Sequence, residues 1–266
     1  AFHGRTMMAI ALNGSKRMTE GFGPMPGGIK QHPFNQLDGF KKIINKNTAA
    51  VVIELIQGEA GIVPAKKVFI NEIRKLCKKN NALIVIDEVQ SGVGRTGHLY
   101  AYEKYNIKPD ILCSAKGMGN GIPIGAILTT NKVAKAMQVG AHGSTYGGNP
   151  LACSVSYEVF KEVSKKSFLN SVIKKEKLFI SLLNDLNKKY NCFTAVRSAG
   201  LWIGLELNSK IENLTLQNIM SSAYDEGLMI LKANNNTLRL APALTISEKE
   251  IKLGVKKLEK SLSRLL

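Results

Sequence analysis

The sequence predicts an α/β protein with a large, mostly parallel sheet in its N-terminal part and a smaller α+β part at its C-terminus. Short apolar strands alternate with amphipathic helices through the first half, which is typical of a parallel sheet covered by helices on both faces. The glycine-rich segment 142–150 interrupts this pattern, and the elements after it include a long helix and several strands. We therefore expect two domains, residues 1–149 and residues 150–266.

The elements of the larger domain are expected from residue 49 onward. Ala-Ala-Val-Val-Ile at 49–53 has too little polar alternation for a half-exposed strand, so this strand should be buried. In segment 64–79 apolar residues recur with a period of about 3.6 residues, which predicts a helix. The further elements expected in order are a strand at 82–86, a glycine-rich loop at 92–97, a short helix at 99–105, and strands at 110–114 and 124–130.

The smaller domain is expected to mix helices and strands. Ser247 with Glu250 forms a capping box, which predicts the start of a terminal amphipathic helix. The elements expected before it are helices at 151–163 and 168–190, strands at 193–197 and 201–207, a helix closing at Gly227, and strands at 228–231 and 237–240.

Composition points to a globular, cytoplasmic protein. Of the 266 residues 44% are hydrophobic and 21% charged, which is enough for a large core. No apolar run approaches the roughly 18 residues of a membrane span, and the first residues lack a secretory signal pattern. The four cysteines are far apart, without the paired spacing of a metal site, so we expect reduced thiols and no metal.

The net charge of +17 raises the question of a nucleic-acid partner. The lysines are scattered among asparagine and isoleucine, and aromatic residues do not alternate with them. A stacking platform for bases is therefore not indicated. We expect a solvated basic surface and no nucleic-acid binding.

Lys116 is the most informative residue of the chain. It follows the apolar strand at 110–114 and precedes Gly117, while Asp87 directly follows the strand at 82–86. A lysine and a carboxylate just past two strand ends suit pyridoxal phosphate, whose aldehyde forms a Schiff base with a lysine and whose pyridine nitrogen needs a carboxylate partner. The ordinary alternatives are a solvated lysine and a strand-end aspartate.

Eight segments, in order over the whole chain, resemble those of the class III (fold type I) aminotransferases, and most of all the acetylornithine branch of that family. One such tetrapeptide is weak evidence, whereas eight in order are strong. The matching positions are 2–6, 21–24, 56–59, 87–90, 94–97, Lys116, 142–150 and 239–242.

The resemblance implies a pyridoxal 5'-phosphate-dependent transferase in which Lys116 holds the cofactor and transfers the proton. Asp87 would face the pyridine nitrogen and Gln90 the ring hydroxyl, while Phe2 would stack on the ring. Thr145 would reach the cofactor phosphate of a neighbouring subunit. Phe2 as a core aromatic and Gln90 as a surface amide are the alternatives. The residues so assigned to the cofactor are Phe2, Asp87, Glu88, Val89, Gln90, Lys116 and Thr145.

The resemblance also implies four substrate contacts. Arg5 would bind a substrate carboxylate by a bidentate fork, and Ser144 would touch substrate from its loop. Glu59 would cover Arg239 for one substrate and release it when a dicarboxylate needs a second anchor. The alternatives are a surface ion pair for Arg5, a tight glycine-rich turn at Ser144, and an interdomain salt bridge for Glu59 with Arg239.

The implied reaction moves the terminal amine of N2-acetylornithine to 2-oxoglutarate, giving N-acetylglutamate 5-semialdehyde and glutamate in arginine biosynthesis. Succinyldiaminopimelate, in lysine biosynthesis, would be an additional substrate. The resemblance further implies a homodimer with shared active sites. Two other interpretations stay open: another class III enzyme, acting on ornithine or 4-aminobutyrate, and a non-catalytic remnant.

The chain departs from the family pattern in three respects. Leu55 stands where the family usually has proline, and Gly117 and Asn120 replace other small residues after the lysine. The Phe-His-Gly-Arg motif at the start lies well inside a family-length protein. We therefore expect a fragment with an exposed sheet edge, poor solubility and little activity alone. Whether an in-frame Gly-Thr phosphate turn is encoded upstream separates a working enzyme from a remnant.

Overall fold

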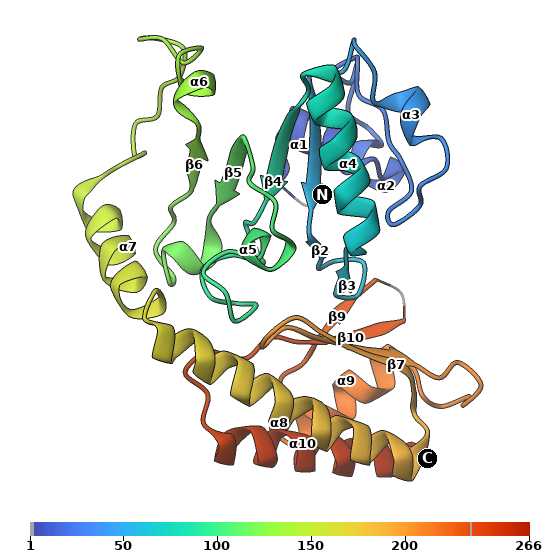
Figure 1. Ribbon diagram of the computed structural model, residues 1–266. Coiled ribbons are helices and arrows are strands. Elements are labelled where there is room, and N and C mark those ends of the chain that lie inside the picture. The colour runs from blue at the N-terminus through green and yellow to red at the C-terminus, as the bar shows by residue number, and fades with distance from the viewer. Residues whose placement is uncertain (1–2, 235) are drawn as a thin grey trace. The chain divides into compact units, whose positions relative to one another are not determined.

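The computed structural model describes residues 3–234 and 236–266, which form two compact units (Figure 1). Unit 1 consists of Ala1–Leu55, Ala65–Val93 and Tyr100–Glu162. Unit 2 consists of Ile56–Pro64, Gly94–Leu99 and Val163–Leu266. These units are not the same as the predicted domains, because unit 2 takes two short segments from the first 149 residues. The domains 1–149 and 150–266 stay a prediction.

Unit 1 is built on a four-stranded sheet in the order β1-β4-β5-β6 (Figure 1). Neighbours β1, β4 and β5 are parallel, and β6 runs antiparallel to β5. The mostly parallel sheet is thus confirmed. The outer strands carry exposed apolar side chains, among them Val52 and Ile127. The strand bounds are β1 Ala50–Glu54, β4 Leu83–Asp87, β5 Ile111–Ser114 and β6 Ala126–Thr129.

Helix α4 (Lys67–Asn80) covers β1 and β4 with its apolar face. It begins three residues later than the periodicity predicts, because Val63 and Pro64 pair with Gln57 and Ile56 as a short ladder. The short helix expected at 99–105 covers only Tyr102–Tyr105. The remaining helices are α1 Met7–Asn13, α2 Lys16–Thr19, α3 Phe40–Ile43, α5 Tyr102–Tyr105, α6 Asn131–Ala134, α7 Pro150–Val163 and the 3₁₀ turn η1 Lys116–Met118.

Unit 2 is built on an antiparallel sheet in the order β7-β8-β10-β9. Helix α8 packs against β7 and α10, and α10 also packs against α9. The capping box of Ser247 and Glu250 is confirmed at the start of α10. The bounds are β2 Ile56–Gln57, β3 Val63–Pro64, α8 Lys166–Tyr190, β7 Phe193–Ser198, β8 Ile203–Leu207, α9 Leu216–Asp225, β9 Leu231–Ala233, β10 Thr237–Leu240 and α10 Glu248–Ser263.

The strand predicted at 228–231 is wrong in position, since β9 covers Leu231–Ala233. The N–H groups of Gly227 and Leu228 donate to carbonyls of α9, at Tyr224 and Ala223 respectively. With Gly227 at φ +66, this is a left-handed helix end, which uses backbone donors that a strand would need. The strand therefore starts only after this turn.

We predict opposite effects on stability for two glycines of unit 2. Gly200 has φ +64, and an added Cβ would lie 2.3 Å from the Arg95 carbonyl oxygen. Gly200→Ala should therefore lower the free energy of unfolding by about 2 kcal/mol or more. At Gly254, inside α10, an added Cβ would make an ordinary van der Waals contact, with Leu228 Cδ1 at 3.9 Å. Gly254→Ala should raise stability by roughly 0.5–1 kcal/mol.

Urea unfolding of both variants measures these effects. The two substitutions add the same methyl group, so a difference in sign isolates the backbone conformation at residue 200. Equal midpoints for the two variants would contradict the close approach of Gly200 to Arg95.

Candidate active site

Asp87 and Lys116 follow two neighbouring parallel strands at the same edge of the sheet. Asp87 ends β4 and pairs in register with Cys113 of β5. Lys116 comes three residues after Cys113, beyond the end of β5 at Ser114. Ligands of open α/β sheets bind at the carboxyl edge of the strands. The predicted placement of the two residues at adjacent strand ends is confirmed.

The Asp87 carboxylate is buried, at 4% exposure, and already has two partners. Its Oδ1 accepts a hydrogen bond from the Val89 backbone N–H at 3.0 Å, and Oδ2 lies 3.1 Å from His3 Nδ1. The bond to Asp87 raises the pKa of His3 above its usual value of 6.5, and burial opposes this shift. The His3 imidazole therefore contacts Oδ2, and the Val89 N–H bonds the other carboxylate oxygen, Oδ1.

The contact between His3 and Asp87 was not expected from the sequence. The only signal was its position between Phe2 and Gly4 in a segment that resembles the family. Phe2, assigned to the cofactor ring, lies outside the described residues.

Lys116 lies in the left-handed region, with φ +47. It opens the 3₁₀ turn Lys116–Met118, in which Gly119 N–H donates to the Lys116 carbonyl at 3.0 Å. Only glycine fits at position 119, because an added Cβ would lie 1.9 Å from the Ile122 carbonyl oxygen. A non-glycine residue in this region costs on the order of 1–3 kcal/mol and persists where the surroundings impose it, often at functional sites.

Glu88, Val89 and Gln90 form the turn directly after Asp87. Val89 and Gln90 are partly exposed, whereas Glu88 is fully buried. The Glu88 carboxylate accepts hydrogen bonds from Ser91 Oγ and from the backbone N–H groups of Ala101 and Tyr102. Val89 and Gln90 thus stay candidates for the cofactor, and the Glu88 oxygens are taken by protein donors.

Burial raises the pKa of Glu88 from 4.5 to about 7, and its three hydrogen bonds only partly oppose this. Because the folded state binds more protons between pH 4.5 and 7, the free energy of unfolding should fall as pH rises through this window. The expected loss is on the order of 3 kcal/mol. Urea unfolding at pH 5 and at pH 8 measures it.

Glu88→Gln should remove most of this pH dependence, because the glutamine carries no titrating group. The control is Glu20→Gln, at an exposed position directly after α2, which should keep it. A Glu88→Gln protein as pH-sensitive as the parent would rule out Glu88 as the source.

Glu59 and Arg239 form an ion pair in unit 2, with Arg239 Nη1 2.5 Å from Glu59 Oε1. The Arg239 side chain is 14% exposed and that of Glu59 53%. Their predicted pairing is confirmed. Both residues belong to unit 2, so the pair does not bridge the two units. The Arg239 side chain is thus more deeply buried than the carboxylate that pairs with it, and the substrate role of the pair stays a prediction.

The other predicted substrate residues lie in exposed parts of unit 1. The Arg5 guanidinium contacts the Met18 sulfur. Ser144 and Thr145 are exposed, and Ser144 Oγ accepts from the Gly147 N–H at 2.9 Å. This bond shapes the loop and leaves the substrate role of Ser144 and the cofactor role of Thr145 as predictions.

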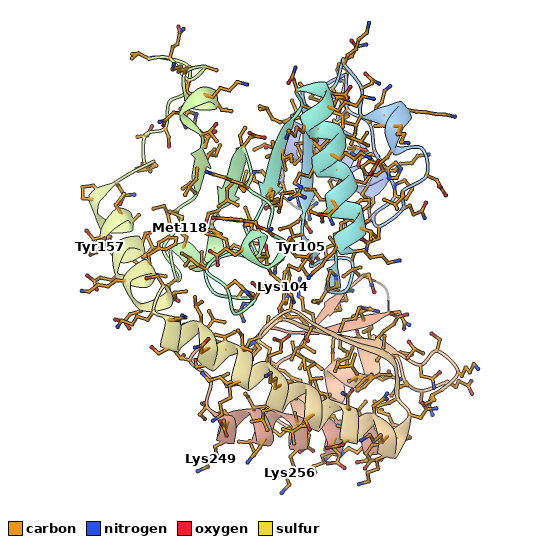
Figure 2. All side chains as sticks on the ribbon, in the orientation of Figure 1. Lys104, Tyr105, Met118, Tyr157, Lys249 and Lys256 are labelled. Carbon is orange, nitrogen blue, oxygen red and sulfur yellow. The ribbon has the colours of Figure 1, made fainter. Side chains whose placement is uncertain are left out.

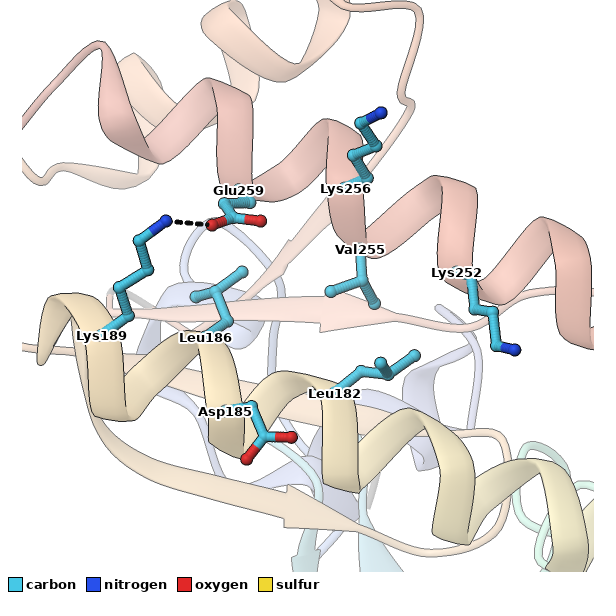
Figure 3. Close-up of a pocket in the computed structure, with 8 residues that line it drawn as sticks. All are labelled: Leu182, Asp185, Leu186, Lys189, Lys252, Val255, Lys256 and Glu259. Carbon is cyan, nitrogen blue, oxygen red and sulfur yellow. Dashed lines mark hydrogen bonds and ion pairs between the residues drawn. The ribbon is translucent and has the colours of Figure 1, made fainter.

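A groove of about 360 Å³ lies between α8 and α10 in unit 2 (Figure 3). The Lys189–Glu259 ion pair, at 2.9 Å, crosses from one helix to the other beside it. None of the candidate site residues lines it. Its lining residues are Leu182, Asp185, Leu186, Lys189, Lys252, Val255, Lys256 and Glu259.

Among residues 3–234 and 236–266, His, Cys, Asp and Glu side chains form no group of three or more that could hold a metal ion. No helix within the described part of the chain has the length and apolar character needed to cross a membrane.

The fold and the two strand ends define an α/β protein of the fold type I transferases. The sequence model of the family "Aminotransferase class-III" matches residues 1–262 of this chain. The chain therefore belongs to the class-III aminotransferases, a family that depends on pyridoxal phosphate.

Two curated enzymes are similar to this chain over most of its length. The acetylornithine/succinyldiaminopimelate aminotransferase of Buchnera aphidicola subsp. Schizaphis graminum is 47% identical over all 266 residues, covering 66% of that enzyme. The succinylornithine transaminase of Yersinia pseudotuberculosis is 43% identical, over 97% of this chain and 62% of that enzyme. The chain thus spans about two thirds of the length of the curated relatives it matches.

A solved structure extends the likeness to three dimensions. The ornithine aminotransferase of Toxoplasma gondii, described with partial occupancy of pyridoxal phosphate at its active site, has a TM-score of 0.90 and 26% identity. The match covers 98% of this chain and 62% of that one.

The residues present fit pyridoxal phosphate at its ring. A buried carboxylate, with His3 Nδ1 at 3.1 Å from its Oδ2, stands at the end of β4 where the pyridine nitrogen needs one, and a lysine follows the neighbouring strand. Gly117 and Gly119 follow the lysine, and the space that their missing side chains leave is taken by Val93 and by the Ile122 carbonyl.

Proposed function

We propose that the protein moves the terminal amino group of N2-acetylornithine to 2-oxoglutarate, with pyridoxal phosphate on Lys116. The observation that carries the proposal is the placement of buried Asp87 and Lys116 beyond adjacent parallel strands. The names of the relatives support the choice of amine. When bound, the cofactor supplies an aldehyde for the amino group and a cationic ring that accepts electrons.

The residues of this chain divide the work by their chemistry. The Asp87 carboxylate keeps the ring nitrogen protonated, and the Lys116 amine carries a proton between the substrate carbon and the cofactor. Arg5 binds the substrate carboxylate by two parallel hydrogen bonds. Gln90 is assigned to the ring hydroxyl and Thr145 to the phosphate.

Glu59 and Arg239 distinguish the two substrates. 2-Oxoglutarate carries a second carboxylate, which displaces Glu59 and binds Arg239. N2-Acetylornithine needs no such anchor, so the ion pair of 2.5 Å stays closed. The 53% exposure of Glu59 lets it swing into water when displaced.

Glu59→Gln is expected to lower KM for 2-oxoglutarate roughly two- to fivefold, because an ion pair this exposed contributes up to about 1 kcal/mol. The KM for N2-acetylornithine should change little, and 2-oxoglutarate should inhibit the first half-reaction more strongly. Steady-state kinetics with both substrates measure these constants.

A matched control lies in the same sheet. Glu206 pairs with Arg197 at 2.5 Å, also in unit 2, and Glu206→Gln should leave both KM values unchanged. An unchanged or higher KM for 2-oxoglutarate in Glu59→Gln would contradict the displacement.

We also infer that two copies of the chain share their active sites. Large apolar side chains are exposed along β6, the following loop and α7, including Ile127, Met137, Tyr146 and Tyr157; Figure 2 labels Tyr157. The Ser144–Thr145 loop lies in the same stretch of sequence. Sedimentation of the protein as its gene encodes it should give a dimer, and a monomer that turns over substrate would refute shared sites.

The test of the proposed function has two readouts, both on the protein as its gene encodes it. Borohydride reduction followed by peptide mass spectrometry should place the cofactor on Lys116. Amino transfer to 2-oxoglutarate is then compared for N2-acetylornithine, succinyldiaminopimelate, ornithine and 4-aminobutyrate. Highest kcat/KM with ornithine or 4-aminobutyrate would replace the proposed substrate. Absence of both labelling and transfer would establish the non-catalytic alternative.

A further inference from the structure

Glu88 lies at the centre of a buried network that joins the ends of β4 and β5 to the start of α5. None of its surface is exposed. Its carboxylate accepts from Ser91 Oγ at 3.0 Å and from the N–H groups of Ala101 and Tyr102 at 2.8 and 2.7 Å. Its backbone is fixed as well, since its N–H donates to the Cys113 carbonyl at 2.9 Å. One residue thus joins the end of β5 to the start of α5 and to the turn after β4.

One route leads from Glu88 to the residue two places before Lys116. Tyr100 directly precedes Ala101, whose N–H is held by Glu88. The Tyr100 hydroxyl donates to Ser114 Oγ at 3.1 Å, and both side chains are buried. Ser114 is the last residue of β5, so this bond fixes the strand end from which Lys116 emerges.

A second route leads to the residue directly after Lys116. Glu88 holds the turn through Ser91 and through its carbonyl, which accepts from the Gly92 N–H at 3.0 Å. The next residue, Val93, is buried and lies at φ +52, where a β-branched residue is a genuine outlier. Its Cβ would be 3.4 Å from a Cβ added at Gly117. The strained valine therefore packs against the turn that Lys116 opens.

We propose that Glu88 is a positioning residue for Lys116, holding the backbone on both sides of it through Tyr100–Ser114 and Val93–Gly117. Lys116 itself has φ +47, a conformation that persists only where the surroundings impose it. This inference rests on the proposed function, in which Lys116 carries the cofactor. It assigns Glu88 a different role from the cofactor contact that the resemblance implies.

Hydrogen exchange of the cofactor-free protein tests the coupling without any chemistry at Lys116. The reporters are the amides of Met118 and Gly119, which donate to Ala115 and Lys116 at 3.1 and 3.0 Å. Glu88→Gln turns one buried acceptor into a donor, and Tyr100→Phe removes one hydrogen bond. Exchange at both reporters should become roughly tenfold faster in each variant, as expected for a lost buried bond.

The matched control is Tyr105→Phe. Tyr105 lies on α5, close in sequence to Tyr100, but its hydroxyl donates to the Leu55 carbonyl at 3.3 Å and not to β5; Figure 2 labels Tyr105 and Met118. Exchange at the reporters should be unchanged. Ser114→Ala, which removes the partner of Tyr100, should reproduce the effect of Tyr100→Phe and serves if Glu88→Gln does not fold.

Cofactor attachment supplies the second readout. The rate of labelling of Lys116 by pyridoxal phosphate, trapped with borohydride, should fall roughly tenfold in Glu88→Gln and Tyr100→Phe, and the pH at which the visible band changes should shift. Attachment and exchange that match the parent in both variants would overturn the positioning role. Failure of the parent to label Lys116 would instead refute the proposed function, and the exchange data would still decide whether Glu88 holds the turn.

Discussion

Lys116→Ala is expected to abolish the visible absorbance band of the bound cofactor and to lower kcat by about 10⁴ or more. The substitution removes both the amine that binds the aldehyde and the base that moves the proton. Proton transfer by a positioned side chain alone contributes up to about 10⁴ in rate. Absorbance spectroscopy and a coupled assay for glutamate, on the protein as its gene encodes it, measure the two losses.

Lys104→Ala is the control for this prediction. Lys104 lies on α5 in the same unit and is exposed (Figure 2), so its loss removes a lysine without touching the strand ends. It should keep both band and rate. A Lys116→Ala protein that retains the band, or more than about one hundredth of the rate, would show that another group holds the cofactor.

The strand ends of the site could be predicted because their signals are local. Apolar runs that stop at Asp87 and just before Lys116 need no knowledge of the rest of the chain. The same holds for the capping box at Ser247, which depends on residues three apart. Short-range chemistry of this kind is read directly from sequence.

The partners of the site residues could not be predicted in the same way. His3 and Asp87 are 84 positions apart. Two of the three donors to Glu88 are backbone groups, of Ala101 and Tyr102, so the side chains of these two residues give no sign of the bonds. The left-handed conformation of Val93 is likewise contrary to the preference of a β-branched residue. These contacts and this backbone conformation depend on segments far apart in the sequence. The role proposed for Glu88 could therefore not be predicted from the sequence alone.

The misplaced β9 has a similar cause on a smaller scale. Leu228–Leu231 is apolar enough for a strand, but the turn at Gly227 takes the N–H groups of Gly227 and Leu228 for α9. Hydropathy does not report where a helix end closes, and the competition for backbone donors decides the boundary.

Asp87→Asn is expected to have the second large effect, and to show it in two independent ways. The asparagine oxygen can replace the acceptor of the Val89 bond at 3.0 Å, so the turn should stay intact. Without the charge the ring nitrogen loses its partner, and kcat should fall roughly 10²- to 10³-fold, as for other preorganised electrostatic contacts.

The second effect of Asp87→Asn is on His3 and needs no cofactor. The hydrogen bond to Asp87 is the largest cause of the raised pKa of His3, so the substitution should return that pKa toward 6.5. Proton NMR titration can resolve it, because the chain has only 4 histidines. Asp110→Asn is the control: Asp110 accepts from the Ile84 N–H at 2.8 Å at the other edge of the sheet, and should change neither the His3 pKa nor kcat substantially. A fall in kcat with an unchanged His3 pKa would mean that the His3–Asp87 contact does not form in solution, while a lowered pKa with full activity would remove Asp87 from the cofactor site.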